Sequence, residues 1–120
     1  MQHVIIGAGP AGVIAAEHLR KFAPDSSIKL IGDEPDPPYS RMALPYYLMD
    51  KIKEEGTHLR SSLDHFSFMG IDVIQDRVNS IDATGHSLQM NKGGKLAFDT
   101  LLIATGSHPV RPLIPGMDLE

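Results

Sequence analysis

The feature that most constrains this chain is a glycine motif set between an apolar strand and a helix. Residues 3–6 read HVII, and residues 7–12 read GAGPAG, a match to GxGxxG. A short run of β-branched residues that ends at glycine is typical of a buried parallel strand. A helix is expected from Pro10 to Phe22, because apolar residues recur along one face before a Pro-Asp pair ends the run. The residues of that face are Val13, Ala16, Leu19 and Phe22.

Further apolar runs predict an α/β fold with a parallel sheet and a small antiparallel excursion. Residues 27–32, 71–74 and 100–106 are expected to form three more strands of the parallel sheet. Three short runs separated by glycine-containing turns predict an antiparallel β-meander. These runs are residues 77–82, 86–90 and 95–98.

Two shorter helices are expected between the second and third strands. Residues 40–49 predict a helix that is interrupted at Pro45. The next helix should be capped by Ser61 or Ser62 and should stop at Gly70. Residues 107–120 contain three prolines and are expected to be irregular.

The position of the glycine motif predicts a dinucleotide site in a Rossmann-like domain. Gly7 permits a tight turn, Gly9 lets the backbone approach a pyrophosphate, and Gly12 allows close contact between helix and strand. The helix N-terminus that follows offers unpaired N–H groups and a positive dipole end to the phosphates. The alternative is a plain glycine turn without a ligand.

Two acidic residues follow the second expected strand. Asp33 and Glu34 lie roughly 20 residues beyond the motif, where a carboxylate commonly accepts hydrogen bonds from a ribose. Such an acid disfavours a 2′-phosphate, so the ligand should be FAD or NAD and not NADP. Asp33 is slightly favoured for the ribose role, and the alternative is that both acids are solvated turn residues.

A third small-residue segment follows the last expected strand. Ala104, Thr105 and Gly106 should reach the same carboxyl edge of the sheet as the glycine motif. Small residues there let the backbone approach a ligand, and the Thr105 hydroxyl can add a hydrogen bond. The alternative is an ordinary turn after a core strand.

Composition excludes several classes of function. The chain has 120 residues, a net charge of −4 and no clustered basic residues, which argues against nucleic acid and anionic membranes as partners. It has no cysteine, so disulfide, thiolate–metal and cysteine-based redox chemistry are excluded within it. Its six histidines do not have metal-ligand spacing, and no metal site is expected. The apolar N-terminus lacks the basic region of a signal peptide, so a cytoplasmic location is expected.

Taken together, VIIGAGPAG, GDEP, the meander and DTLLIATGSHPVRPLIPG resemble the FAD-dependent pyridine nucleotide–disulfide oxidoreductase family. The chain is most similar to the subgroup of nitrite, rubredoxin and ferredoxin reductases, NADH oxidases and coenzyme A disulfide reductases. The resemblance covers essentially the whole chain. It implies an enzyme that passes electrons from NADH or NADPH through FAD to an acceptor.

The resemblance also implies roles for particular residues. The FAD pyrophosphate would be held by the glycine motif, and the adenosine ribose by Asp33 or Glu34. Backbone of Val78 would meet adenine, Arg41 would approach the FAD, and the segment from Ala104 to Gly106 would pack against the dinucleotide. No residue of this chain is expected to be catalytic. The motif residues concerned are Gly7, Gly9, Pro10, Ala11 and Gly12.

Two positions depart from the family pattern. Met42 takes the place of a cysteine that stands beside the flavin in the coenzyme A disulfide reductase and NADH oxidase branch, although Ser40 lies nearer than the family serine. A thioether forms neither thiolate nor mixed disulfide, so this slot is expected to be inert. Plain packing of Met42 is the alternative. Tyr46 stands where the reductases carry a lysine, and Tyr39, Tyr46 and Tyr47 could line a flavin pocket or pack locally.

Family members are more than twice as long as this chain. Residues 1–120 are therefore expected to be a truncated FAD-binding domain, without the nicotinamide-binding and C-terminal domains. Such a piece should bind FAD weakly and should not oxidise NADH, whereas the full-length protein should be a homodimer with a possible protein redox partner. Two alternatives stay open at this point: a stand-alone, non-catalytic dinucleotide-binding module, and the less favoured NAD-binding domain of a dehydrogenase.

Overall fold

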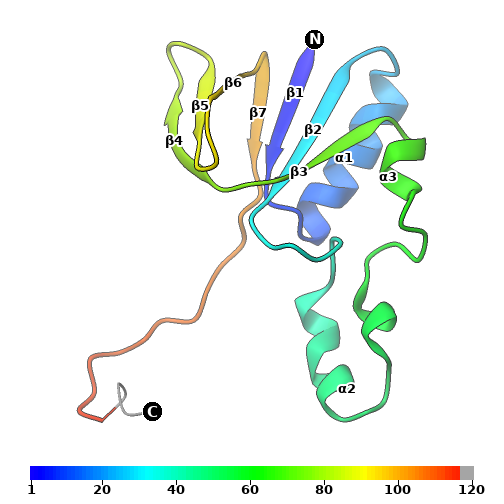
Figure 1. Cartoon of the computed structure of the whole chain (residues 1–120), viewed down its shortest axis with the longest axis vertical. Coiled ribbons are helices and arrows are strands. Elements are labelled where there is room, and N and C mark those ends of the chain that lie inside the picture. The colour runs from blue at the N-terminus through cyan, green and yellow to red at the C-terminus, as the bar shows by residue number, and fades with distance from the viewer. Residues whose placement is uncertain (117–120) are drawn as a thin grey trace.

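A computed structural model of the chain describes residues 1–116, and its centre is a four-stranded parallel sheet. The strands lie in the order β3-β2-β1-β7 (Figure 1). β1 spans Gln2–Ile6, β2 Ser27–Gly32, β3 Ile71–Gln75 and β7 Thr100–Ile103. The predicted parallel sheet is therefore confirmed, with the last strand ending three residues earlier than expected.

Helices cover one face of the sheet. α1 spans Pro10–Phe22, as predicted, and α3 is a single turn at His65–Phe68. Their buried residues Val13, Ala16 and Phe66 pack with Ile5 and Leu30 of the strands. This layer buries only Ile5 of the three apolar residues in β1, and a parallel strand needs covering on its other face as well.

One predicted member of the α1 core face is wrong. Val13 and Ala16 are buried and Leu19 packs against the core, but Phe22 is 83% exposed. Each step of three residues falls short of a full helical turn by about 60°. Three such steps place Phe22 about half a turn away from Val13, on the solvent side.

The antiparallel meander covers the other face, as Figure 1 shows beside β7. β4 spans Val78–Asp82, β5 Ser87–Met90 and β6 Lys95–Ala97, which confirms the predicted order β4-β5-β6. Leu88, Met90 and Phe98 pack against Val4 and Ile6. Ile5 faces the helices while Val4 and Ile6 face the meander, which explains the unbroken apolar run at the start of the chain.

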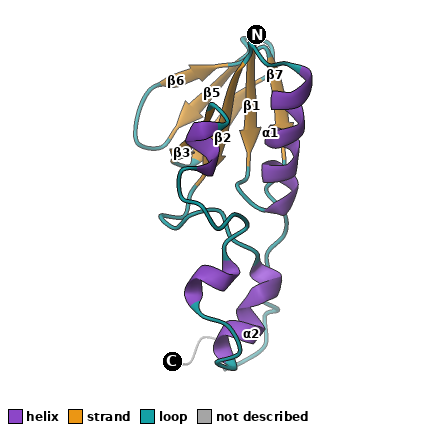
Figure 2. Ribbon diagram, turned by 90° about the vertical axis from the view of Figure 1, so that its right-hand side faces the viewer, coloured by secondary structure: helices purple, strands orange, loops and turns teal. Residues whose placement is uncertain are grey.

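Residues 39–58, here called the arm, extend away from the carboxyl edge of the sheet (Figure 2). The arm carries a 3₁₀ turn at Arg41–Ala43, α2 at Leu44–Leu48 and a second 3₁₀ turn at Glu54–Thr57. Pro45 does not interrupt this helix, because it lies in the first turn, where no N–H donor is needed. The expected break at Pro45 is therefore wrong.

The base of the arm is a short antiparallel pairing of its two ends. Tyr39 and His58 form a β-bridge. The Ser40 amide donates to the Thr57 carbonyl at 2.9 Å, and the Leu59 amide donates to the Pro38 carbonyl at 2.9 Å. These bonds fix where the chain leaves the sheet and where it returns.

Two helix-end predictions have different outcomes. Gly70 follows the end of α3 with φ +65°, the left-handed conformation expected at a helix stop. The N-cap is Asp64, without a side-chain cap, and not Ser61 or Ser62. The helix is a single turn, so it begins after both serines.

The segment after β7 contains no helix or strand up to residue 116, as expected; residues 117–120 of the predicted irregular tail lie outside the described residues. Within the described part of the chain, no helix is both long and apolar enough to cross a membrane.

Candidate functional site

The glycine loop lies at the carboxyl edge of the sheet, at the point where the chain order reverses. β2 and β3 continue to one side of β1, whereas β7 lies on the other. Ligands of open α/β sheets bind at such a switch point. The loops after all four parallel strands reach this edge, and the residues predicted from the sequence follow those strands.

Gly7 is in contact with the strand end that carries the Ala-Thr-Gly segment. Its φ is +112°, and a β-carbon there would collide with the Ala104 carbonyl. The Ala104 amide donates to the Ile6 carbonyl at 2.7 Å, and the Gly7 amide donates to the Ile31 carbonyl at 2.8 Å. The first and the last of the predicted small-residue segments are therefore adjacent in space.

Gly12 and Gly9 have opposite surroundings. A β-carbon at Gly12 would overlap the Gly7 carbonyl oxygen and would lie 3.3 Å from Cδ1 of Leu30. A β-carbon at Gly9 would have no atom within 4 Å. Gly12 thus packs the helix against the loop, while Gly9 presents open backbone to solvent.

The N-terminus of α1 has the electrostatics of an anion site. Gly9 is its N-cap and provides no side-chain cap, and its first turn, at Pro10 and Ala11, holds no acidic residue. Arg20 and Lys21 lie in the last turn, where they complement the negative dipole end. The N–H groups of the first turn are consequently available to a phosphate.

Asp33 and Glu34 both follow β2, but they pair with different parts of the chain. Asp33 lies 3.7 Å from Arg77, which precedes the meander, and both side chains are largely exposed. Glu34 accepts a 2.8 Å hydrogen bond from Nη2 of Arg41 in the arm. Sequence reasoning named Glu34 and Arg41 separately and missed that they form a pair.

A tyrosine completes the Glu34 cluster. Tyr39 is half-buried at the base of the arm. The neighbouring Glu34 carboxylate raises the pKa of the Tyr39 hydroxyl, and burial acts in the same direction. The Glu34 charge also raises the pKa of the Arg41 guanidinium. These three groups come from residues 34–41, a segment that contains three prolines.

The remaining residues that were predicted to contact the dinucleotide are Val78 and the segment after β7. Val78 begins β4 and pairs with Met90 in the meander. Thr105 is exposed, and Gly106 has φ +69° with open space where a β-carbon would be. Asp76, buried just before Val78, was missed by sequence reasoning. It accepts hydrogen bonds from the amides of Arg77 and Lys92 and so fixes this corner.

Met42 and the other two arm tyrosines are not core residues. Met42 is 84% exposed, and Tyr46 and Tyr47 are also exposed. Plain packing of Met42 within the described residues is therefore wrong, as is local core packing of Tyr46 and Tyr47. The expected inert character of the Met42 position is a matter of its thioether chemistry and stays a prediction.

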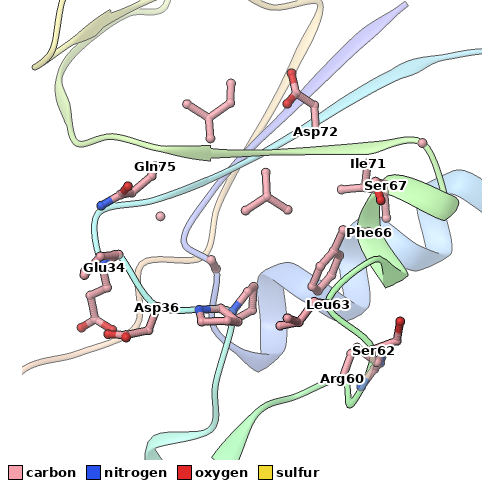
Figure 3. Close-up of a pocket in the computed structure, with 18 residues that line it drawn as sticks. Glu34, Asp36, Arg60, Ser62, Leu63, Phe66, Ser67, Ile71, Asp72 and Gln75 are labelled. Atoms are coloured by element: carbon pink, nitrogen blue, oxygen red, sulfur yellow. The ribbon is translucent and has the colours of Figure 1, made fainter. Parts of the chain in front are cut away.

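A pocket of about 730 Å³ opens beside the glycine loop, between β3, α3 and the proline segment (Figure 3). Its walls are largely apolar, with Leu63, Phe66 and Ile71 on one side and Glu34 and Asp36 at the end near the loop. Of the residues predicted from the sequence, only Glu34 lines it. The sequence did not predict this pocket, because it is assembled from residues of three segments.

An ion-pair cluster holds one wall of the pocket against α1. Arg60 donates from Nε and Nη2 to the two oxygens of Glu17, at 2.7 and 2.6 Å. His65 Nε2 lies 2.8 Å from Glu17 Oε1. Hydrogen bonding from Arg60 lowers the pKa of the Glu17 carboxyl, against the opposing effect of burial. Within residues 1–116, no group of three or more His, Cys, Asp or Glu side chains could hold a metal ion.

Comparison with known proteins places these features in a family. A family model described as pyridine nucleotide-disulphide oxidoreductase matches residues 1–120. An NADH oxidase of Methanocaldococcus jannaschii is 30% identical over 100% of this chain and 28% of its own length. The ferredoxin–NAD(+) reductase component of the biphenyl dioxygenase system of Paraburkholderia xenovorans is 36% identical over 96% of this chain and 28% of its own.

A solved structure has the same fold at similar identity. The putidaredoxin reductase–putidaredoxin complex matches with a TM-score of 0.84 and 32% identity. The match covers 93% of this chain and 27% of that chain. The chain therefore spans little more than a quarter of the length of the relatives that it matches.

Proposed function

The chain belongs to the pyridine nucleotide-disulphide oxidoreductase family, and we propose that it is the FAD-binding part of an NAD(P)H-dependent flavoprotein oxidoreductase. One observation carries this proposal: the glycine loop, the acids after β2 and the Ala104 strand end meet at one edge of a parallel sheet. Gly7 and Gly12 leave no room for a side chain and Gly9 leaves its backbone open, which suits a backbone cradle for a pyrophosphate.

Each predicted residue has a role in binding FAD under this proposal. The amides after Gly9 receive the pyrophosphate, and Asp33 or Glu34 accepts hydrogen bonds from the ribose. The Val78 backbone meets adenine, and residues 104–106 pack along the dinucleotide. Arg41 lies beside the same ligand. When bound, FAD supplies the electron-transfer chemistry, while this chain binds and orients it.

The rest of the proposed enzyme concerns the whole protein. We infer that NADH or NADPH is bound by sequence beyond this part, as befits a chain that spans about 28% of its relatives. The acceptor is a protein redox partner such as a ferredoxin, or oxygen; residues 1–120 themselves offer no cysteine for a thiol-dependent step. A cytoplasmic homodimer is the form that we propose for the full-length protein.

The test is FAD retention by the purified chain and by two variants at the helix N-cap. Asp and Asn are both good N-caps with nearly the same shape, and Gly9 has open space for either. Gly9→Asn should fold but should retain less flavin than the wild type after desalting, because its side chain occupies the space in which the backbone approaches the pyrophosphate. Gly9→Asp should fold equally well but should lose most of the band, because its charge repels the pyrophosphate.

Retention of flavin at the wild-type level by both Gly9→Asp and Gly9→Asn would show that the pyrophosphate does not lie at this helix. The wild-type chain loaded with FAD should not oxidise NADH. Rapid NADH oxidation by these 120 residues would contradict the proposal that the nicotinamide cofactor is bound by sequence beyond this part.

A further inference from the structure

The helix-facing side of β7 is less covered than that of the two strands beside it. The strand register aligns Leu102 with Ile5 of β1, and Ile5 with Leu30 of β2, so these three side chains form one row on the helix-facing side of the sheet. Ile5 and Leu30 are fully buried, whereas Leu102 is 42% exposed. Val73, at the other end of the row, lines the pocket described above. α1 lies over β1, β2 and β3, and α3 lies over β3, which leaves Leu102 open.

The hydrogen bonds of α1 show which of its sides faces β7. Glu17 bonds to Arg60 and His65, which lie on the side of α3. Arg20 donates to the Met69 carbonyl at the end of α3. Both residues therefore point toward β3, which lies beyond β2, whereas β7 lies on the other side of β1 (Figure 1). The side of α1 opposite to Glu17 and Arg20 is consequently the side toward β7.

A second apolar stripe runs along that opposite side of α1. Ala11, Ala15, His18 and Phe22 recur at intervals of three or four residues, so they lie within about 60° of one another around the helix axis. They are about 100–180° away from the two charged residues that point toward α3. Phe22 is 83% exposed, Ala11 and His18 are also exposed, and Ala15 is half-buried. This stripe is distinct from the core stripe of the same helix.

Leu102 and these four residues of α1 form one surface, here called the α1–β7 face. None of the five is Asp, Glu, Lys or Arg. A helix of a globular protein normally has one apolar stripe, which faces its core, so a second stripe indicates a second contact. The two alanines let a neighbouring helix approach α1 closely, and Phe22 and Leu102 offer larger apolar contacts.

The length of the relatives indicates what covers this face. The chain spans 28% of the Methanocaldococcus jannaschii NADH oxidase and 28% of the Paraburkholderia xenovorans reductase component. The strands of a parallel sheet are normally covered on both faces by the protein's own elements. Leu101 already packs with the meander on one face of β7, so only the helix-facing side lacks a layer.

We propose that an amphipathic helix from the sequence after residue 120 of the same protein docks on the α1–β7 face, beside α1 and over β7. This inference rests on the part of the proposed function that assigns the chain to a longer protein. The docking helix carries apolar residues at intervals of three and four, and its apolar stripe contacts Ala15, Phe22 and Leu102. With it in place, the helix layer extends over all four parallel strands.

The first test places the photoreactive residue benzoylphenylalanine at position 22 of the full-length protein. Irradiation should give a cross-link within one molecule, which mass spectrometry should map to a helical segment beyond residue 120. The same substitution at Phe68, which is 93% exposed and belongs to α3, is the matched control and should not react with that segment. A cross-link between two molecules would show that a second copy covers the face, and the proposed occupant would be wrong.

The second test compares one substitution in two contexts. Phe22→Lys should leave the urea midpoint of the 120-residue chain unchanged, because the side chain is exposed there. In the full-length protein it should lower the thermal midpoint by several degrees, because a lysine would be buried without a partner. Phe68→Lys is the control and should leave both midpoints unchanged. If Phe22→Lys has no effect in the full-length protein either, no element covers Phe22.

FAD retention separates this inference from the proposed function. If the full-length protein retains FAD but position 22 forms no cross-link and tolerates lysine, the face is open and the inference fails, while the proposed function stands. If the encoding gene ends at residue 120, the inference fails together with the proposal that the nicotinamide cofactor is bound by later sequence.

Discussion

Gly12 lets α1 pack closely against the glycine loop, because it has no β-carbon. A β-carbon there would overlap the Gly7 carbonyl oxygen, so α1 would have to move away from the loop. We expect Gly12→Ala to lower the free energy of unfolding by about 2–4 kcal/mol, even though alanine favours helix by roughly 1 kcal/mol. Gly9→Ala, with open space, should cost less than about 1 kcal/mol. Urea denaturation of both variants decides the matter: equal midpoints would mean that the close approach at Gly12 does not exist.

Glu17 makes the stability of the chain depend on pH. Arg60 and His65 hydrogen bond to its carboxylate, and its pKa in the folded chain is lowered by Arg60 above all. A carboxylate with a lowered folded-state pKa stabilises the fold above its unfolded pKa, about 4.3, and this stabilisation is lost as the pH falls through the folded value. Glu17→Gln should therefore destabilise the chain by about 1–3 kcal/mol at pH 7 and by much less at pH 3.

The same measurement includes its own control. Chemical denaturation at both pH values should also be recorded for Glu54→Gln, a carboxylate on the exposed second 3₁₀ turn of the arm. That variant should follow the wild type at each pH. A Glu17→Gln deficit that is equally large at pH 3 would mean that shape, and not charge, is what Glu17 contributes.

At the scale of elements, Arg20 joins three of them through its guanidinium. It lies in the last turn of α1 and donates hydrogen bonds to backbone carbonyls near the end of α3 and the start of β2. Its four closest acceptors are the carbonyls of Pro24, Ser26, Met69 and Gly70, at 2.7–2.8 Å. These bonds to a charged group satisfy carbonyls that the turn and the helix end leave free.

Arg20→Met keeps the aliphatic stem and removes every one of these donors. We expect it to lower the free energy of unfolding by about 2–4 kcal/mol, because several carbonyls lose their partner. Lys21→Met, at the exposed neighbouring position, is the control and should stay within about 0.5 kcal/mol of the wild type. If both variants have the same urea midpoint, the guanidinium bonds do not hold these elements together.

Asp76 has the corresponding role for the meander. Its buried carboxylate accepts from the amides of Arg77 and Lys92, and so ties the end of β3 to the turn between β5 and β6. Asp76→Ala should expose the amides of residues 77–97 to faster hydrogen exchange, with less effect on amides of β1 and β2. Asp82→Ala, at an exposed turn acid, serves as the comparison. Uniform acceleration over the whole chain would contradict a local role for Asp76.

The sequence predicted elements that repeat a simple local pattern. The strand ends at Ile6 and Gly32, the helix at residues 10–22 and the meander follow from apolar runs and glycine turns, and the structure confirms them. The exposure of Phe22 was not predicted from the sequence. Residues spaced by three lie on nearly the same helix face over one step, but after three steps the last residue lies about half a turn away. The length of α3 was also overestimated, because tertiary contacts, which the local pattern does not contain, decide how many residues of a polar segment become helical.

The candidate site divides in the same way. The contact of Gly7 with Ala104 follows from placing two glycine-ended strands at one sheet edge. Glu34 pairs with Arg41 across a segment of three prolines, whereas the Arg60–Glu17 pair and the pocket join residues from separate segments. Nothing in the local sequence specifies such partners, because they depend on the path of the arm and of α3.

At the scale of the whole molecule, the folded unit and the segment after β7 differ in their contacts. β7 pairs with β1 along His3–Ile6, and the His3 ring hydrogen bonds to Thr100 at 2.5 Å. Residues 107–116 are exposed throughout, including Val110 and Leu113. Folding stability depends on buried surface and not on chain length, so this segment should contribute almost nothing to it.

Two truncations test where the folded unit ends. Removing residues 107–120 should leave the free energy of unfolding within about 0.5 kcal/mol of the full value, because only exposed described residues are lost. Removing residues 99–120 also deletes β7, which uncovers one edge of β1 and the buried side chain of His3, and this chain should not fold cooperatively. Circular dichroism during urea denaturation distinguishes the two. A clear loss of stability on removal of residues 107–120 would contradict this boundary. It would show that the segment packs on the sheet and that the folded unit includes it.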